Sequence, residues 1–112
     1  MNDKFREAAE FLKAAGHPAR LEILSRLASG VLCVSDMGEV LGAAQPNISQ
    51  HLAVLRRSGI VDYYVDGKQR CYFLKDARAL EVVSLVKKKR ASLPAPSCCP
   101  ATGTRRGRAR AV

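Results

Sequence analysis

The stretch QPNISQHLAVLRRSGIVDYYVDGKQRCYFL, residues 45–74, decides the fold of this chain. In its first half, Ile48, Leu52 and Leu55 share one face of a helix that begins near Gln45-Pro46 and runs to Ser58, at about 100° per residue. The residues that point away from this narrow apolar stripe are polar or small: Asn47, Gln50, Ala53 and Arg57. The pattern predicts a helix with one buried face and a broad polar face that is free to contact a partner.

The second half of the stretch predicts a β-hairpin. Gly59 ends the preceding helix, and residues 60–65 are β-branched or aromatic except for Asp62. A second extended run covers residues 70–74, and the two runs are joined through Asp66-Gly67, a strong local hairpin signal. We therefore expect a polar-faced helix followed directly by a two-stranded hairpin.

Upstream of this stretch, residues 3–15 and 18–28 have helical periodicity and are separated by the break Gly16-His17-Pro18. A short apolar stretch follows at residues 31–34, and then a short third helix from its predicted N-cap Ser35 to Gly42. Downstream, a last helix starts at Lys75 or Asp76 and extends to Arg90. It is apolar on more than one side, which a dimer interface explains and a deeply packed helix explains equally well.

The order of these elements predicts a mainly α fold with a β-hairpin wing, a homodimeric winged helix-turn-helix. The folded and dimerising domain is expected at residues 1–90. Residues 91–112 are rich in Pro, Ala, Ser, Gly and Arg and are expected to form a flexible tail that carries two cysteines.

The net charge of +9 says little about the folded part. Eight basic residues and no acidic ones lie between Lys87 and the C-terminus. The preceding 86 residues hold the other 11 of the 19 basic residues and all 10 acidic ones, a balance of +1. The prediction of a DNA partner therefore comes from the middle of the chain.

The polar helix face and the hairpin are predicted to bind double-stranded DNA. Amide side chains make bidentate hydrogen bonds to adenine, and arginine contacts guanine or phosphate. Basic side chains on the hairpin reach flanking phosphates or the minor groove. His51, at the edge of the apolar stripe, is expected to pack partly or to contact a phosphate rather than to bind a metal. The predicted DNA-binding residues are Gln45, Asn47, Ser49, Gln50, His51, Arg56, Arg57, Lys68 and Arg70.

Residues 12–80 resemble the ArsR-type (ArsR/SmtB) metalloregulatory repressors. The segments that carry the resemblance are AGHPARLEIL (15–24), LCVSD (32–36), QPNISQHLAVLR (45–56), GIV (59–61) and DGK (66–68). One departure is Ala44, where the family usually has a serine that caps the recognition helix. Loss of such a cap costs about 1 kcal/mol. The resemblance implies a homodimeric winged-helix repressor that reads its operator with residues 45–57 and 66–70 and leaves it when an inducer binds.

The inducer must be inferred from the four cysteines at positions 33, 71, 98 and 99. Arsenite sensors of this family often have Cys-Val-Cys-Asp before the third helix, whereas this chain has Cys33-Val34-Ser35-Asp36. The last helix contains no histidine, so the family's zinc site on that helix is also missing.

The adjacent pair Cys98-Cys99, together with Cys33 from the same or the partner chain, is predicted to bind trivalent arsenic or antimony through three thiolates. Some arsenic sensors of the family use a C-terminal Cys-Cys pair. The alternative is a thiol switch, in which the pair senses oxidants or persulfides by forming a disulfide with Cys33. Cys71 is expected to be a small packing group, and packing also competes with a sensing role for Cys33.

Other classes fit less well. No nucleophile–base pair, phosphate loop or paired carboxylate stands out, so we expect no enzyme and no required cofactor. No apolar run approaches the roughly 18 residues of a membrane span, and the polar start is not a signal peptide, so a cytoplasmic protein is expected. A winged-helix interaction module that does not bind DNA is the remaining alternative.

Overall fold

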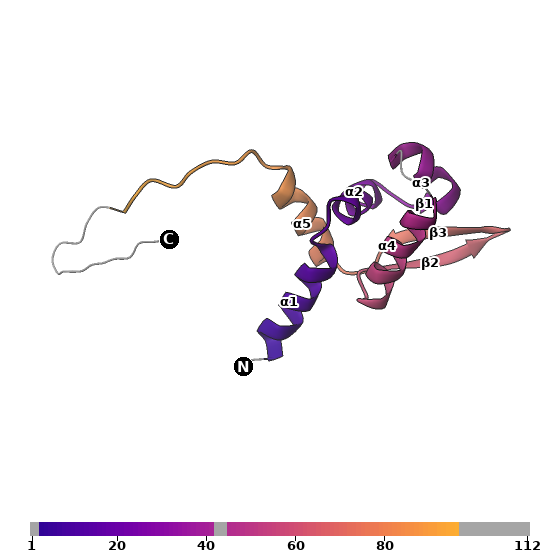
Figure 1. The fold of residues 1–112 in the computed structure, drawn as a ribbon, viewed down its shortest axis with the longest axis horizontal. Helices are drawn as coiled ribbons and strands as arrows, with labels where there is room; N and C mark the ends of the chain where they lie inside the picture. The colour runs from indigo at the N-terminus through magenta and orange to yellow at the C-terminus, as the bar shows by residue number, and fades with distance from the viewer. Residues whose placement is uncertain (1–2, 42–44, 97–112) are drawn as a thin grey trace.

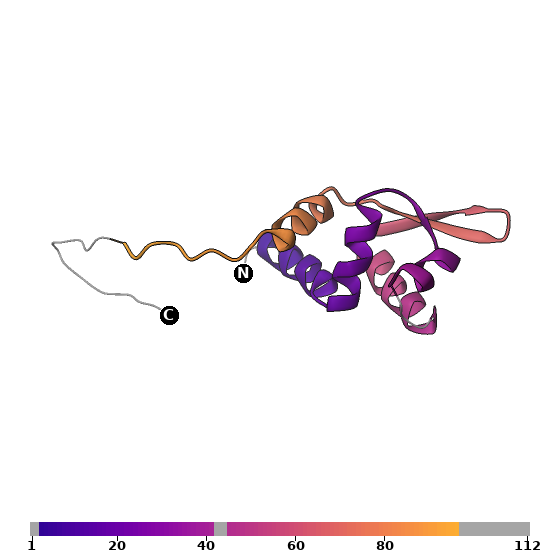
Figure 2. The same cartoon turned by 90° about the horizontal axis from the view of Figure 1, so that it is seen from above.

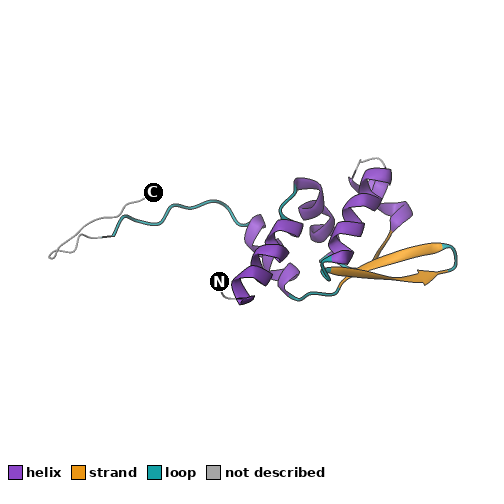
Figure 3. Ribbon diagram, turned by 60° about the horizontal axis from the view of Figure 1, so that its bottom comes forward, coloured by secondary structure: helices purple, strands orange, loops and turns teal. Residues whose placement is uncertain are grey.

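The computed structural model describes residues 3–41 and 45–96, and its helices and its hairpin follow the predicted order (Figure 1). The elements are α1 Asp3–Ala15, α2 Pro18–Leu27, β1 Leu32–Cys33, α3 Val34–Leu41, α4 Gln45–Arg57, β2 Val61–Asp66, β3 Gln69–Leu74 and α5 Arg78–Lys87. The prediction of a mainly helical winged helix-turn-helix with a hairpin wing is confirmed. Figure 3 shows α4 lying beside the hairpin, which extends away from the helices.

Two glycines shape the segment from α4 to the wing. Gly59, just beyond α4, has a φ of 78°, and Gly67 in the hairpin has a φ of 65°. Both angles lie in the left-handed region that only glycine adopts at little cost. Because Asp66 pairs with Gln69, the two-residue turn is Gly67-Lys68, and Lys68 stands at the tip of the wing.

A third strand, which we did not predict, completes the sheet. β1 pairs antiparallel with β3, so that the strand order is β1-β3-β2. Leu32 lies opposite Tyr72, and Cys33 lies opposite Cys71. A strand of two residues is too short to show alternation in the sequence, which explains why residues 31–34 were recognised only as an apolar stretch.

The core gathers side chains from all five helices and the sheet. Ile48, Leu52 and Leu55 are at most 1% exposed, so the predicted inner face of α4 is buried. Leu24 of α2 and Met37 of α3 are fully buried in the same cluster. This packing holds α4 against the body of the domain and leaves its polar side facing outward.

Three predicted boundaries need correction or fall outside the described residues. α3 begins at Val34, so Ser35 lies within its first turn and is not its N-cap. α5 ends at Lys87, three residues before the predicted end. Just before this helix, Asp76 Oδ1 accepts a hydrogen bond from the backbone N–H of Arg78, the first residue of α5, at 2.9 Å. The missing cap at Ala44 lies outside the described residues.

The end of the domain opposite the wing tip is formed by α1 and α5 (Figure 2). Several large apolar side chains of these two helices are about half exposed or more: Phe5, Leu12, Leu80, Leu85 and Val86. Residues 88–96 form neither helix nor strand, and the tail beyond them lies outside the described residues. Within the described ranges, no helix is long and apolar enough to cross a membrane.

Candidate nucleic-acid interface

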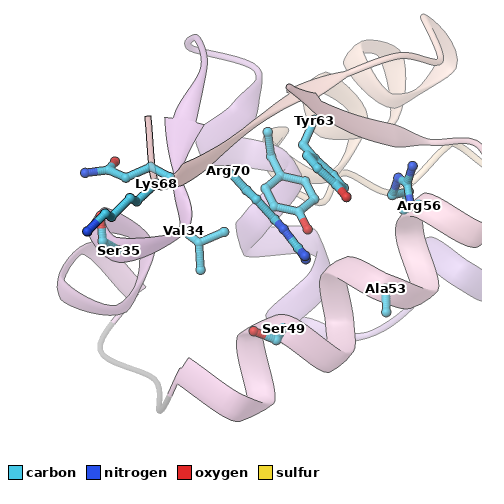
Figure 4. Close-up of a pocket in the computed structure, with 10 residues that line it drawn as sticks. Val34, Ser35, Ser49, Ala53, Arg56, Tyr63, Lys68 and Arg70 are labelled. Atoms are coloured by element: carbon cyan, nitrogen blue, oxygen red, sulfur yellow. The ribbon is translucent and has the colours of Figure 1, made fainter. Parts of the chain in front are cut away.

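A cleft of about 420 Å³ lies between α4 and the wing. Figure 4 shows Tyr63 and Arg70 projecting from the hairpin into the space between the hairpin and α4. The lining residues come from three elements of the winged helix-turn-helix: Val34 and Ser35 of α3; Ser49, Ala53 and Arg56 of α4; and Tyr63, Lys68, Gln69, Arg70 and Tyr72 of the hairpin. The fold thus brings four of the predicted DNA-binding residues to one surface.

The ring of Tyr63 positions two arginines in this cleft. The guanidinium carbon of Arg56 lies 4.6 Å from the ring centroid, and that of Arg70 lies 4.9 Å from it. Such cation–π contacts hold the long side chains in place without neutralising their charge. The ring of Tyr63 is in turn packed on Tyr72, at a centroid distance of 5.1 Å.

The two arginines differ in their other partners. Arg56 Nε donates to Asp62 Oδ1 at 3.0 Å. The pKa of Asp62 is lowered, first by a hydrogen bond from the backbone N–H of Tyr63 and then by this contact with Arg56. In the described part of the chain, no carboxylate lies within ion-pair distance of Arg70 or Lys68. Of the basic residues that line the cleft, Lys68 and Arg70 on the wing are therefore the two whose charge is most available to an anion.

The remaining predicted residues of α4 take different positions. Asn47 and Gln50 are exposed. Arg57 is exposed too, but it does not line the cleft; it lines two other hollows, one beside Lys75 and one beside α1. The side chain of Gln45 lies outside the described part of the structure.

His51 is partly packed and has protein partners. Arg20 Nε donates a hydrogen bond to His51 Nδ1 at 3.2 Å, and the rings of His51 and His17 lie 4.5 Å apart. His17 itself caps α2, since its Nδ1 accepts a hydrogen bond from the backbone N–H of Ala19 at 3.1 Å. The pKa of His51 is lowered by burial and then by His17 and Arg20. The geometry gives His51 a role in joining α4 to α2.

We expect His51 to make the domain less stable in acid. Because its pKa is lower in the folded state, protonation favours unfolding, and stability falls as the pH drops from about 6.5 through the folded-state pKa. His51→Gln keeps an acceptor for Arg20 but does not titrate. Its melting temperature should therefore fall less than that of the wild type between pH 7 and pH 5. An equal fall in thermal unfolding of both proteins would show that His51 does not contribute.

The sequence analysis did not identify three residues that line the cleft, the aromatic residues Tyr63 and Tyr72 and the small residue Ala53. The sequence does indicate which residues of α4 line the cleft together. Ser49, Ala53 and Arg56 are spaced by four and three residues and therefore share one face of the helix. Arg70 and Tyr72 alternate along β3 and share a sheet face. The spacing along the chain does not show that this face of α4 and this face of the hairpin lie opposite each other.

Cys33 has a neighbour that the sequence did not predict. Cys33 Sγ lies 3.0 Å from Cys71 Sγ. Cys71 is only 3% exposed, as expected for a packing group, but its sulfur contacts the proposed sensor residue. The hydrogen bond with Cys71 and burial raise the pKa of the Cys33 thiol to about 11. The predicted ligands Cys98 and Cys99 lie outside the described residues, and within those residues no three His, Cys, Asp or Glu side chains are grouped for a metal.

Known proteins are similar to this chain in sequence and in fold. Residues 17–63 match the family described as bacterial regulatory protein, arsR family. An HTH-type transcriptional regulator of Methanocaldococcus jannaschii is 41% identical over 85 residues, which are 75% of this chain and 96% of the relative. A biofilm growth-associated repressor of Xylella fastidiosa is 38% identical over 84 residues, 75% of this chain and 74% of the relative.

A solved structure of reduced HlyU from Vibrio cholerae superimposes with a TM-score of 0.72 at 31% identity, covering 75% of this chain and 88% of that one. The family match covers α2, α3 and α4, and the family is one of transcriptional regulators. The chain therefore belongs to the arsR family of winged helix-turn-helix, DNA-binding transcriptional regulators.

Proposed function

We propose that this protein is a homodimeric repressor that binds operator DNA with α4 and the wing and leaves it when its thiols react with an oxidant or a persulfide. The observation that carries the DNA-binding half is the shared cleft, in which Ser49 and Arg56 of α4 lie beside Lys68 and Arg70 of the wing. A helix and a hairpin that present polar and basic groups on one side match the docking of a winged helix on a duplex.

In this arrangement α4 enters the major groove, which is about 12 Å wide and admits one helix. Asn47 and Gln50 are exposed and carry amide groups, which suit adenine edges. Lys68 at the tip of the wing and Arg70 behind it suit the phosphates beside that groove. We assign sequence reading to α4 and most of the non-specific affinity to the wing.

The dimer is supported by the exposed apolar side chains of α1 and α5. Five large apolar side chains of these two helices are about half exposed or more, among them Phe5 at 66% and Leu85 at 63%, and a partner chain would cover them. A second copy of the chain is the partner that suits operator binding, because a two-fold dimer presents two recognition helices to two half-sites. The same face lies at the end of the domain away from the wing and would leave both wings free (Figure 2).

A thiol switch is favoured as the mode of induction. The similar structure from Vibrio cholerae is titled as reduced HlyU, which names a redox state, and the described part of this chain holds two thiols in contact. The binding of trivalent arsenic or antimony by Cys98, Cys99 and Cys33 stays a prediction, which the same experiment tests.

The test is a fluorescence anisotropy titration of DNA from upstream of the protein's own gene. The reduced protein should bind at nanomolar concentrations, and peroxide or tetrasulfide should weaken binding at least tenfold, reversibly with dithiothreitol. A variant with all four cysteines replaced by serine should bind DNA equally well and ignore the oxidants. Sedimentation of the reduced protein should give a dimer.

Other outcomes would contradict parts of the proposal. Release by arsenite or antimonite, with no response to oxidants, would establish the metalloid prediction instead. No binding of the reduced protein to any DNA at low salt would favour an interaction module that does not bind DNA.

A further inference from the structure

Cys33 and Cys71 lie close enough together to form a disulfide. They are direct partners in the β1–β3 ladder. Such partners in antiparallel strands have Cα atoms about 4.5–5.5 Å apart, within the range of about 4.4–6.8 Å found for disulfides. Their sulfurs lie 3.0 Å apart, about 1 Å beyond the S–S bond length of about 2.05 Å. Formation of the bond therefore requires the two residues to move about 1 Å closer together.

We propose that Cys33 and Cys71 are the redox-sensing pair of this repressor and that a reversible disulfide between them reshapes the DNA-binding cleft. The inference deepens the proposed function and rests on it. It differs from the sequence-based hypothesis, in which Cys33 is joined to the tail cysteines.

The reaction is a two-electron oxidation and balances with hydrogen peroxide as the oxidant. One thiolate of the pair attacks a peroxide oxygen, the O–O bond breaks, and a sulfenic acid forms while hydroxide leaves and takes up a proton. The second thiol then attacks the sulfenic sulfur. The S–S bond forms, and the sulfenic oxygen leaves as water with the proton of the second thiol. Two thiols and one peroxide thus give one disulfide and two water molecules.

The sulfurs lie directly behind the DNA-facing surface. The two residues that follow Cys33, Val34 and Ser35, line the cleft, as do Arg70 and Tyr72 on either side of Cys71. Val34 is also the first residue of α3, so the bond would tie the start of the helix-turn-helix to the base of the wing. If the bond draws β3 toward β1, Arg70 and Tyr72 move with the backbone of β3. Both side chains contact the ring of Tyr63, so its position in the cleft would change as well.

The surroundings of Cys33 disfavour its thiolate form. Cys33, Cys71 and Tyr64 form one row across the three strands, and Tyr64 is about half exposed. The hydrogen bond with Cys71, burial and the negative charges of Asp36 and Asp66 raise the pKa of Cys33. Because the thiolate is the attacking species, attack by Cys33 should be slow at neutral pH and become faster as the pH rises. This chemistry suits a switch that responds to sustained rather than brief exposure.

The experiment uses the full chain and three variants: Cys33→Ser, Cys71→Ser, and a matched control with both Cys98→Ser and Cys99→Ser. Each protein is treated with hydrogen peroxide, alkylated and digested with trypsin. In the wild type and the control, we expect a disulfide between the peptide of residues 27–56 and that of residues 71–75. DNA affinity should fall at least tenfold in both and recover with dithiothreitol. Cys33→Ser and Cys71→Ser should bind DNA when reduced and keep that affinity in peroxide.

Two results would overturn the inference. One is a disulfide that joins Cys33 to the tail, with no oxidation of the control. The other is a Cys33–Cys71 disulfide that leaves DNA affinity unchanged. If the reduced protein binds no DNA, the proposed function fails, whereas the peptide analysis still reports separately whether the pair forms its bond.

Discussion

Replacing Lys68 and Arg70 together by glutamate is expected to lower the affinity for operator DNA about 100-fold at physiological salt. Lys68 stands in the turn of the wing, and Arg70 lies on the cleft beside Tyr63. No carboxylate of the described residues pairs with either of them, so their charge is available to phosphates. The plot of log K against log salt has a negative slope, and each phosphate contact contributes about 0.9 to its magnitude. The loss of two contacts should therefore make the slope shallower by about 2.

The matched control reverses two charges outside the cleft, Lys13→Glu with Arg26→Glu. Both pairs change the net charge by the same amount, and all four side chains are exposed. Stability should change by no more than about 0.5 kcal/mol per substitution in either variant. The wing assignment is wrong if the control loses as much DNA affinity as the wing variant, because total charge would then explain both losses.

Replacing Leu52 by alanine is expected to lower the free energy of unfolding by about 2–5 kcal/mol. Leu52 is 0% exposed and lies on the inner face of α4 between Ile48 and Leu55, which are equally enclosed. The substitution removes apolar contacts and leaves a cavity that the neighbours fill only in part. Since domains of this kind have a total stability of about 5–15 kcal/mol, this single change removes a large share of it. Urea unfolding followed by circular dichroism measures the effect.

Gln50→Ala is the matched control on the outer side of the same helix. Gln50 is exposed, so its substitution should change the unfolding free energy by less than about 0.5 kcal/mol and act on DNA affinity instead. The two variants therefore separate the packing face of α4 from its recognition face. A loss below about 1 kcal/mol for Leu52→Ala would mean that α4 is not anchored by this core.

The fold was largely predictable because its signals are local. The period of Ile48, Leu52 and Leu55 predicted α4, and the backbone freedom of Gly59 and Gly67 marked its end and the hairpin turn. Boundaries were less accurate at α3 and α5, where one or two residues at a helix end carry little free energy and tertiary contacts select the end.

The candidate site was predictable in composition but not in arrangement. The polar face of α4 and the basic wing were identified from residue type and spacing. Arg56 is held by Asp62, whereas Arg70 lies over the ring of Tyr63 and pairs with no carboxylate of the described residues. This difference depends on how the helix and the hairpin pack. His51 likewise gained partners, Arg20 and His17, that lie more than 30 residues away in the chain.

By itself, then, the sequence determined the helix-turn-helix, the wing and the outward polar face of α4, because periodicity and turn conformations act between near neighbours in the chain. The tertiary structure alone decided which residues share the cleft and that Cys33 lies against Cys71, 38 positions further along. The physical reason is that β1, a strand of two residues, has no pattern of its own and is defined only by its hydrogen bonds to β3. That pairing turns two cysteines that looked unrelated into a pair able to form a bond.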